Sequence, residues 1–211
     1  YNTAREGIVI SRMVWDALLY RDPATNEYLP NLATSYNWVD SKTLEFDLRK
    51  DVTFHNGEKF DADDVVYTLT YISNPENGAK PARNVNWWDS AEKLGDYKVR
   101  LNLTKEFPAA LEFLSGPIVM YPNEYYAEVG PEGMAMKPVG TGPYAVTSVE
   151  PGKRYKFKKN NNYHASSPKG QANIGNIVIR TIAESNTQLA ELFSGGVDWI
   201  WKVKPDQAQR I

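Results

Sequence analysis

The sequence predicts a mixed α/β protein of the α+β type, in which strands and helices are combined without strict alternation. Two patterns predict it. Apolar residues alternate with polar ones in several short segments, as in strands, and recur every three or four residues in others, as in helices. The composition agrees, because 42% of the 211 residues are apolar and 24% are charged, a globular profile long enough for one large domain or two modest ones.

The first element expected is a helix over residues 7–20. Its apolar residues share one face at helical spacing: Ile10, Met13, Val14, Ala17 and Leu18. Pro23 ends the helix, because proline disfavours helical geometry in the residue before it. The apolar stripe needs a partner, and we expect it to pack on the sheet predicted after Gly142.

The middle of the chain predicts two hairpins and three helices. Alternating apolar residues place the hairpins over residues 36–48 and 88–103. Between them, Asp61 is suited to cap a helix that ends before Asn74, because its side chain can accept a hydrogen bond from the first turn. Short helices follow Pro108 and Pro122, the second ending near Gly130. Residues 131–142 are rich in Gly and Pro and are expected to be an irregular connector.

The last third predicts a small sheet followed by a helix. A strand holding Val146 and Val149 is followed by strands over residues 154–159 and 176–182. The helix after them should end at Gly195, since glycine tolerates the left-handed geometry after a helix. A strand over residues 197–201 is expected next, with Trp199 buried, and Pro205 suits the start of a further helix.

Several classes of partner are excluded by composition. A formal net charge of −2 gives no broad basic surface, which argues against nucleic acid. No segment has the roughly 20 apolar residues that a membrane span needs.

The absence of Cys excludes disulfides and thiolate metal sites. The chain opens at Tyr1 without a signal-like apolar core, which predicts either a removed leader or a start inside a longer gene product.

The sequence shows no catalytic pattern, so we expect no enzymatic activity and no cofactor. Its two histidines, His55 and His164, are far apart. His55 is expected to bond the backbone of its Asn-Gly turn, and His164 to be solvated in a loop rich in Asn. Nucleophile elbows, zinc-binding helices of the His-Glu-x-x-His type and phosphate-binding loops are absent.

A tight acidic cluster is better explained by helix capping than by a metal. Asp61, Asp63 and Asp64 lack the alternating ligands and distal glutamate of a calcium loop, and acids commonly occupy the first turn of a helix. The Gly140-Thr141-Gly142 segment lacks the third glycine and the preceding strand of a dinucleotide-binding fingerprint. We therefore expect no metal site here.

Three sequence blocks resemble one family in the order in which they occur. The first is Trp15-Asp16-Ala17-Leu18-Leu19-Tyr20 with Leu29–Tyr36, where Asp16-Ala17 and Tyr36 replace the usual Glu-Gly and Trp. The second runs from Leu44 through Phe54-His55-Asn56-Gly57 to Tyr67. The third is Gly140-Thr141-Gly142-Pro143-Tyr144 with the strands and helix after it. Together they are similar to the family 5 extracellular solute-binding proteins, the peptide, nickel and oligosaccharide receptors of bacterial ABC importers.

The resemblance implies a type II periplasmic binding protein-like lobe with an inserted smaller α+β domain. The ligand-facing lobe would comprise residues 1–20 and 138–204, and the insert residues 21–137. Residues 205–211 would begin the crossover to a second lobe. That C-terminal lobe is missing from this sequence, so the resemblance implies a truncated fragment.

The function implied is that of the substrate-binding component of an ABC importer. It would capture a peptide or similar small solute between two lobes and deliver it to an inner-membrane permease, in the periplasm or at the extracytoplasmic face of the cell membrane. The alternative is an enzyme domain whose active site is completed by a missing region. A structural or adhesion module is a third possibility, but it gives no reason for the ordered blocks.

The resemblance also implies where the ligand binds. The first lobe would contribute the segment before its first helix, namely Thr3, Ala4, Arg5, Glu6 and Gly7, and the strand end at Trp201 and Lys202. Free N–H groups of the helix after Gly7 suit a carboxylate or carbonyl, and Trp201 offers a flat apolar wall. From the residues alone, Trp201 is as compatible with a core position as with a pocket, and residues 1–7 with a frayed terminus.

Overall fold

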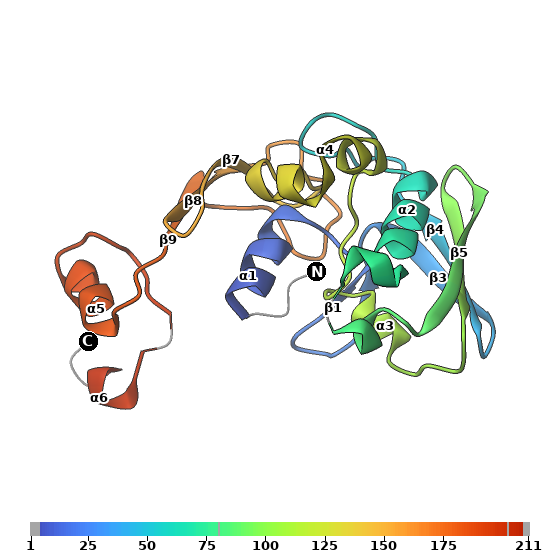
Figure 1. The fold of residues 1–211 in the computed structure, drawn as a ribbon, viewed down its shortest axis with the longest axis horizontal. Coiled ribbons are helices and arrows are strands. Elements are labelled where there is room, and N and C mark those ends of the chain that lie inside the picture. Colours follow the sequence, from blue (N-terminus) through green and yellow to red (C-terminus); the bar gives the residue numbers. More distant parts are fainter. Residues whose placement is uncertain (1–4, 80, 202, 209–211) are drawn as a thin grey trace.

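The computed structural model describes residues 5–79, 81–201 and 203–208. Two hydrophobic cores organise them (Figure 1). The larger core gathers buried side chains between Leu18 and Val139, and the smaller one gathers residues 10–15 with residues 144–179. Strands and helices are mixed without strict alternation, as the sequence predicts.

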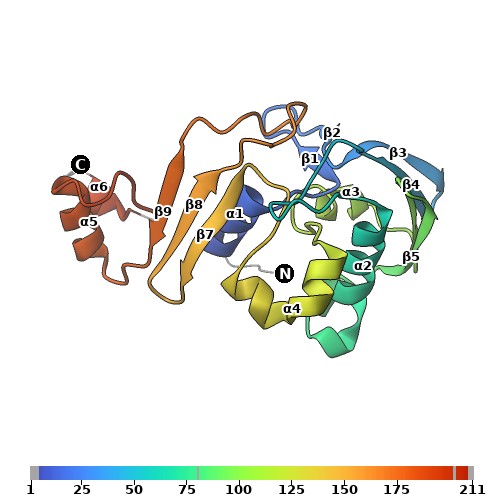
Figure 2. The ribbon, with the colours of Figure 1, turned by 90° about the horizontal axis from the view of Figure 1, so that it is seen from above.

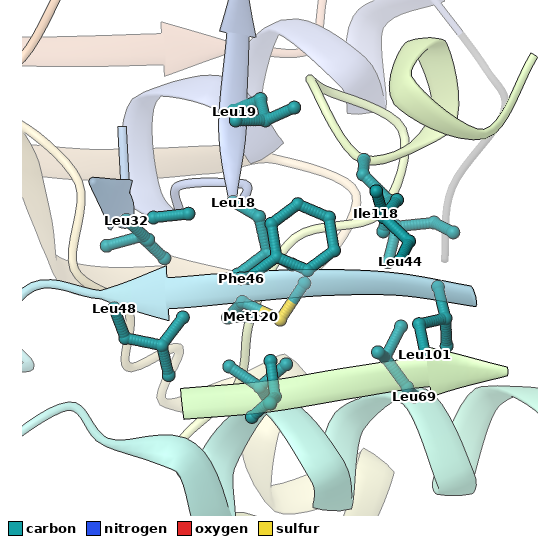
Figure 3. Close-up of a cluster of buried hydrophobic side chains, with 14 of the residues drawn as sticks. Leu18, Leu19, Leu32, Leu44, Phe46, Leu48, Leu69, Leu101, Ile118 and Met120 are labelled. Carbon is teal, nitrogen blue, oxygen red and sulfur yellow. The ribbon is translucent and has the colours of Figure 1, made fainter. Parts of the chain in front are cut away.

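A four-stranded antiparallel sheet forms one side of the larger core. Its order is β3 (Ala33–Asp40), β4 (Thr43–Leu48), β6 (Lys98–Leu103) and β5 (Trp88–Gly95). Every second residue of the two central strands is buried, so the sheet has one apolar face. Phe46 of β4 lies at the centre of this core, surrounded by leucines and by Met120 (Figure 3). A small ribbon of β1 (Leu19–Arg21) and β2 (Tyr28–Pro30) stands beside it.

Helices cover the apolar face of this sheet. The helix α2 (Ala62–Ser73) buries Val65, Leu69 and Ile72 and contacts β5 and β6. Asp61 caps it as predicted, because its carboxylate accepts a hydrogen bond from Asp63 N at 2.8 Å. Two single 3-10 turns follow, and then the short α3 (Ala110–Phe113).

The helix α4 (Asn123–Met136) is longer than predicted. The sequence predicts an end near Gly130 and an irregular connector after it. Gly130 does break the helix, since its φ is +66°, but Pro131 then begins a second helical piece that reaches Met136. A proline at the first position of a helix loses no hydrogen bond, and this explains why a Gly-Pro pair kinks the helix without ending it.

The smaller core lies between one helix and a three-stranded antiparallel sheet. The sheet has the order β7 (Tyr144–Glu150), β8 (Arg154–Lys159) and β9 (Asn176–Arg180). The helix α1 (Arg5–Val14) packs on β7, with Val14 fully buried against Tyr144 and Phe157. The apolar stripe of the first helix therefore packs on the sheet after Gly142, as expected.

The predicted length of the first helix is wrong. The sequence predicts residues 7–20, but α1 spans Arg5–Val14 and the chain then runs irregularly into β1. The apolar stripe that suggested one helix serves two cores, because Val14 belongs to the smaller core and Leu18 to the larger one. The chain has to leave helical geometry to pass from one core to the other.

The described C-terminal residues form two helices beyond β9. These are α5 (Ser185–Phe193) and α6 (Pro205–Ala208), which stand apart from both cores (Figures 1 and 2). Gly195 follows α5 with a φ of +74°, as predicted for its C-terminal end. The strand expected over residues 197–201 is wrong: no strand forms there, because this segment pairs with no strand among the described residues.

Candidate functional site

The proposed ligand-binding residues fall on two segments that are far apart in sequence. Thr3, Ala4 and Lys202 lie outside the described residues. Arg5 and Glu6 are the first two residues of α1, so Gly7 lies inside the first turn rather than before the helix, which corrects the expected boundary. The first backbone N–H groups of a helix have no partner within it. In α1 the first four backbone N–H groups are those of residues 5–8, so they include Arg5, Glu6 and Gly7.

The second segment carries a pair of tryptophans after α5. Trp199 is 65% exposed, so the expectation that it is buried is wrong. Trp201 is half-buried, and its ring meets the Trp199 ring edge to face, with centroids 4.9 Å apart. Without a strand, no alternation directs Trp199 into a core. The pair instead forms an aromatic surface open to solvent.

Both proposed segments adjoin the β7–β9 sheet. In Figures 1 and 2 the first described turn of α1 is the end of that helix nearer to α5 and α6, and Trp199 and Trp201 lie in the sequence between those two helices. Both segments flank the β7–β9 sheet, α1 by packing on β7 and the α5 segment by following β9 directly. The sheet therefore has the helix start of α1 attached through β7 and the aromatic surface attached through β9.

A buried ion pair anchors the C-terminal end of α1. Asp16 is completely buried, and its Oδ1 lies 2.6 Å from Lys169 Nζ. The same ammonium donates to the backbone oxygens of Arg12 at 2.8 Å and Trp15 at 3.0 Å. Lys169 thus satisfies carbonyls that the helix leaves free and places a positive charge at the negative end of its dipole.

Three more side chains complete the network around Asp16. Thr141 Oγ1 donates to its Oδ2 at 3.1 Å, Tyr163 OH donates to its Oδ1 at 3.1 Å, and Asn31 Nδ2 is 3.4 Å from Oδ1. Burial and the nearby carboxylate raise the pKa of Tyr163, so its hydroxyl stays a proton donor. The network ties together residues 12–16, residue 31 and the loop at 163–169. Sequence reasoning missed it, although an aspartate next to the apolar stripe was a signal.

His55 has the structural role that the sequence predicts, but with a distant partner. Its Nε2 lies 2.9 Å from the Gly142 oxygen, and the Gly140 N–H donates to Nδ1 at 3.3 Å. This pattern assigns the proton to Nε2. Burial lowers the pKa of His55, so the ring is neutral near pH 7. His55 therefore fixes the Gly140–Gly142 segment rather than its own turn.

His164 differs from the prediction of a solvated side chain. It is only 6% exposed, because the loop after β8 folds against Arg49 and Asp51 of the other core unit. Burial lowers its pKa, and its Nε2 has no hydrogen-bond partner among the described residues. Its Nδ1 lies 3.5 Å from Ser166 Oγ. In the described part of the chain, no three His, Asp or Glu side chains gather as a metal site would require.

Comparison with known proteins identifies the family. The sequence pattern of the bacterial extracellular solute-binding proteins, family 5 (middle part), matches residues 27–211. This chain belongs to that family. The family 5 chain is 29% identical, over 84% of its own length, to the glutathione-binding protein GsiB of Pectobacterium atrosepticum. It is 25% identical, over 92% of its length, to the di/tripeptide-binding protein 1 of Pseudomonas aeruginosa.

Solved structures support the same assignment. The structure of NikZ from Campylobacter jejuni in complex with Ni(L-His) matches 88% of this family 5 chain with a TM-score of 0.78 and 29% identity. The chain spans 37% of that protein, 34% of GsiB and 40% of the di/tripeptide-binding protein. The resemblance inferred from the three sequence blocks is thereby confirmed, and the chain corresponds to well under half of its relatives.

Proposed function

We propose that this chain forms one ligand-facing surface of the substrate-binding component of an ABC importer. The proposal rests on the family match over residues 27–211, together with the solvent-open tryptophan pair that follows α5. The relatives are named for binding peptides and glutathione, so a peptide or similar small solute is the ligand we propose. The enzyme alternative lacks a positive observation in the described residues.

The geometry suits a peptide in two ways. The free N–H groups at the start of α1 and the positive end of its dipole favour a carboxylate or a carbonyl oxygen. The Trp199–Trp201 surface offers apolar area with few polar groups to satisfy, which suits an aliphatic or aromatic side chain. We propose that Thr3, Ala4, Arg5, Glu6 and Gly7 contact the polar part of the ligand, and that Trp201 and Lys202 contact its side chain.

The proposed division of the chain follows the two cores except at its boundaries, where Leu18, Leu19 and Val139 pack in the larger core. Residues 1–20 and 138–204 form the ligand-facing lobe, residues 21–137 form the inserted domain, and residues 205–211 lead toward a second lobe. The facing surface is then supplied by the part of the relatives that this chain does not span. We further propose an inner-membrane ABC permease as the partner and the periplasm or the outer face of the cell membrane as the location. The described helices are all too short or too polar to span a bilayer.

Tryptophan fluorescence tests the proposed surface. We expect titration with alanyl-leucine and trialanine to change the emission of this chain with a dissociation constant in the millimolar range, because one surface alone encloses little of the ligand. Trp201→Ala should remove most of the response. Trp38→Ala is the matched control, because Trp38 is also partly exposed but lies on β3 of the insert. Equal responses in the two variants, or no response in the parent chain, would refute the proposal.

A further inference from the structure

A groove on the insert lies away from the segments proposed to face the ligand. It runs along α2 and reaches the start of α4, with a volume of about 460 Å³. We name it the tyrosine groove after Tyr67 and Tyr71, which line it with Thr70, Asn74, Asn77 and Asn123. Its volume falls within the roughly 300–1,000 Å³ typical of small-molecule sites. Figure 2 shows α2 and α4 side by side, between the β7–β9 sheet and the β3–β6 sheet and away from α5 and α6.

An aromatic platform forms part of the tyrosine groove. Tyr67 and Tyr71 are one helical turn apart, their ring planes are 25° from parallel, and their centroids lie 5.8 Å apart. Tyr126 of α4 braces them from the side, with its centroid 5.0 Å from Tyr71 and 6.1 Å from Tyr67. Burial and a hydrogen bond with Tyr71 raise the pKa of Tyr126, so this hydroxyl stays protonated. The two lining rings are half-buried and thus held in place while still accessible.

Each of the three asparagines of the groove is held by a hydrogen bond to one of its two side-chain amide groups, either the C=O or the NH₂. Asn74 Oδ1 accepts from Glu76 N at 3.0 Å, and Asn123 Oδ1 accepts from Glu124 N at 2.7 Å. Asn77 Nδ2 donates to the Tyr71 oxygen at 2.9 Å. Within the described part of the chain, the remaining amide group of each has no hydrogen-bond partner. In that part, the NH₂ groups of Asn74 and Asn123 are free to donate, and the C=O group of Asn77 is free to accept. These are oriented polar groups available to a ligand.

The lining carries almost no free charge. Asp63 is its one charged side chain, and Lys93 Nζ neutralises it at 2.8 Å. An anionic or cationic ligand would therefore find no counter-charge. A neutral ligand with an apolar face and several hydroxyls matches both the rings and the amides, because ring C–H groups of a sugar stack on aromatic faces while its hydroxyls both donate and accept.

We propose that the tyrosine groove binds a neutral carbohydrate, with a pyranose ring against Tyr67 and Tyr71 and its hydroxyls bonded to Asn74, Asn77 and Asn123. This site is separate from the α1 and Trp199–Trp201 segments and independent of the proposed importer function. The two sites lie in different core units, so each is tested by variants that leave the other intact.

Calorimetric titration of the chain with maltotriose, cellotriose and N,N′,N″-triacetylchitotriose tests the proposal. We expect saturable binding of at least one of these sugars in the millimolar range, as is usual for a small open site. Thr70→Trp fills the groove from an exposed position and should weaken that binding by at least about tenfold, or about 1.4 kcal/mol. Tyr71→Phe keeps the ring and should bind within about twofold of the parent chain.

A control variant carries the same substitution outside the groove. Thr147→Trp makes the same change at an exposed site on β7, outside the groove, and should leave sugar binding unchanged. Circular dichroism of each variant shows whether it has folded. If none of the three sugars binds saturably, or if Thr70→Trp and Thr147→Trp bind alike, the proposal is wrong. Binding of trialanine that Thr70→Trp abolishes while no sugar binds would also overturn it, in favour of a peptide groove.

Discussion

Individual side chains decide how the two cores are joined, and Asp16 is the most important of them. It is completely buried, carries a charge and is paired with Lys169 at 2.6 Å. A buried ion pair contributes little beyond what an apolar pair of the same shape would, but removing one partner leaves the other charge uncompensated. The network therefore makes the junction sensitive to single substitutions.

Asp16→Asn should lower the free energy of unfolding by about 3 kcal/mol, the lower end of what breaking a buried pair costs. Lys169 retains its two backbone oxygens, which keeps the loss from being larger. Urea denaturation measures it. Asp89→Asn is the control, since Asp89 is exposed on β5 and should change stability by no more than about 0.5 kcal/mol. Similar losses in both variants would contradict a stabilising role for the network.

Asp64 makes stability depend on pH. Burial raises its pKa from 3.8 to about 7, although hydrogen bonds from Asn123 N and Asp61 N oppose the shift. A group whose pKa is raised by folding stabilises the folded state fully below its unfolded pKa and loses that contribution as the pH rises through its folded pKa. The contribution of Asp64 should therefore be present near pH 4 and be lost by about pH 7.

Urea denaturation at a series of pH values tests this directly. The parent chain should lose more stability between pH 4 and pH 7 than the Asp64→Asn variant, which has no proton to release over that window. The difference between the two slopes removes the contribution of other titrating groups. Parallel pH profiles would show that Asp64 titrates at its ordinary pKa.

The elements of the chain depend on close contacts that their own sequences do not reveal. Gly142 N donates to the Val14 oxygen at 2.8 Å, and the Trp15 indole donates to the Val139 oxygen at 2.7 Å. The segment of residues 140–142 can lie against the end of α1 only because Gly140 and Gly142 have no side chains. A Cβ added at Gly142 would be 2.6 Å from the Met13 oxygen.

Gly142→Ala should destabilise the chain by about 2–3 kcal/mol, as expected when extra volume forces packed backbone apart. Thermal unfolding followed by circular dichroism measures it. Gly95→Ala serves as the comparison, because a Cβ there meets nothing within 4 Å, and it should change stability by no more than about 1 kcal/mol. A Gly142→Ala chain as stable as Gly95→Ala would show that the segment can move aside without loss.

Most elements were predictable from the sequence because their signals are local. Alternation in Leu44, Phe46 and Leu48 defined β4, and Asp61 marked the start of α2. Errors occurred where tertiary structure overrides a local pattern. The stripe through Val14 and Leu18 looked like one helix because periodicity does not show that two cores share it.

The candidate site was less predictable than the fold. A strand requires a partner, and the segment holding Trp199 pairs with no strand in the described part of the chain, so alternation gave the wrong burial for this residue. The buried network of Asp16 joins residues up to 157 positions apart, from Arg12 to Lys169. The positions of Arg5–Gly7 and Trp201 came from family resemblance, and their role in binding stays a prediction.

The whole molecule comprises two core units and a C-terminal extension that depends little on either. Leu189 is buried in α5 but belongs to neither core, and the extension is tied to β9 mainly by the exposed pair of Arg180 and Glu191. Exposed ion pairs of this kind contribute little stability. Phe193 and Trp199, at 60% and 65% exposed, leave apolar surface uncovered there.

A chain shortened to end at Ile182 should therefore unfold at nearly the same urea concentration as the parent. We expect a loss of no more than about 1 kcal/mol, the contribution of one surface ion pair and a few exposed contacts. Tyrosine and tryptophan emission would follow the transition. A shortened chain that no longer unfolds cooperatively would show that α5 and α6 support the two cores.

The crossing between the cores has a consequence for how this architecture diversifies. The chain leaves the smaller core at residues 15–17 and returns at residues 139–142, and these two crossings are hydrogen-bonded side by side. The larger unit is therefore an insertion whose two connecting segments lie side by side. A unit attached in this way can be exchanged whole by recombination, provided that its replacement keeps the contacts that Asn31, Arg49 and His55 make with the smaller unit. The fixed requirement is a pair of glycines beside a helix end, which makes Gly140–Gly142 the natural point at which to transplant one unit into another scaffold.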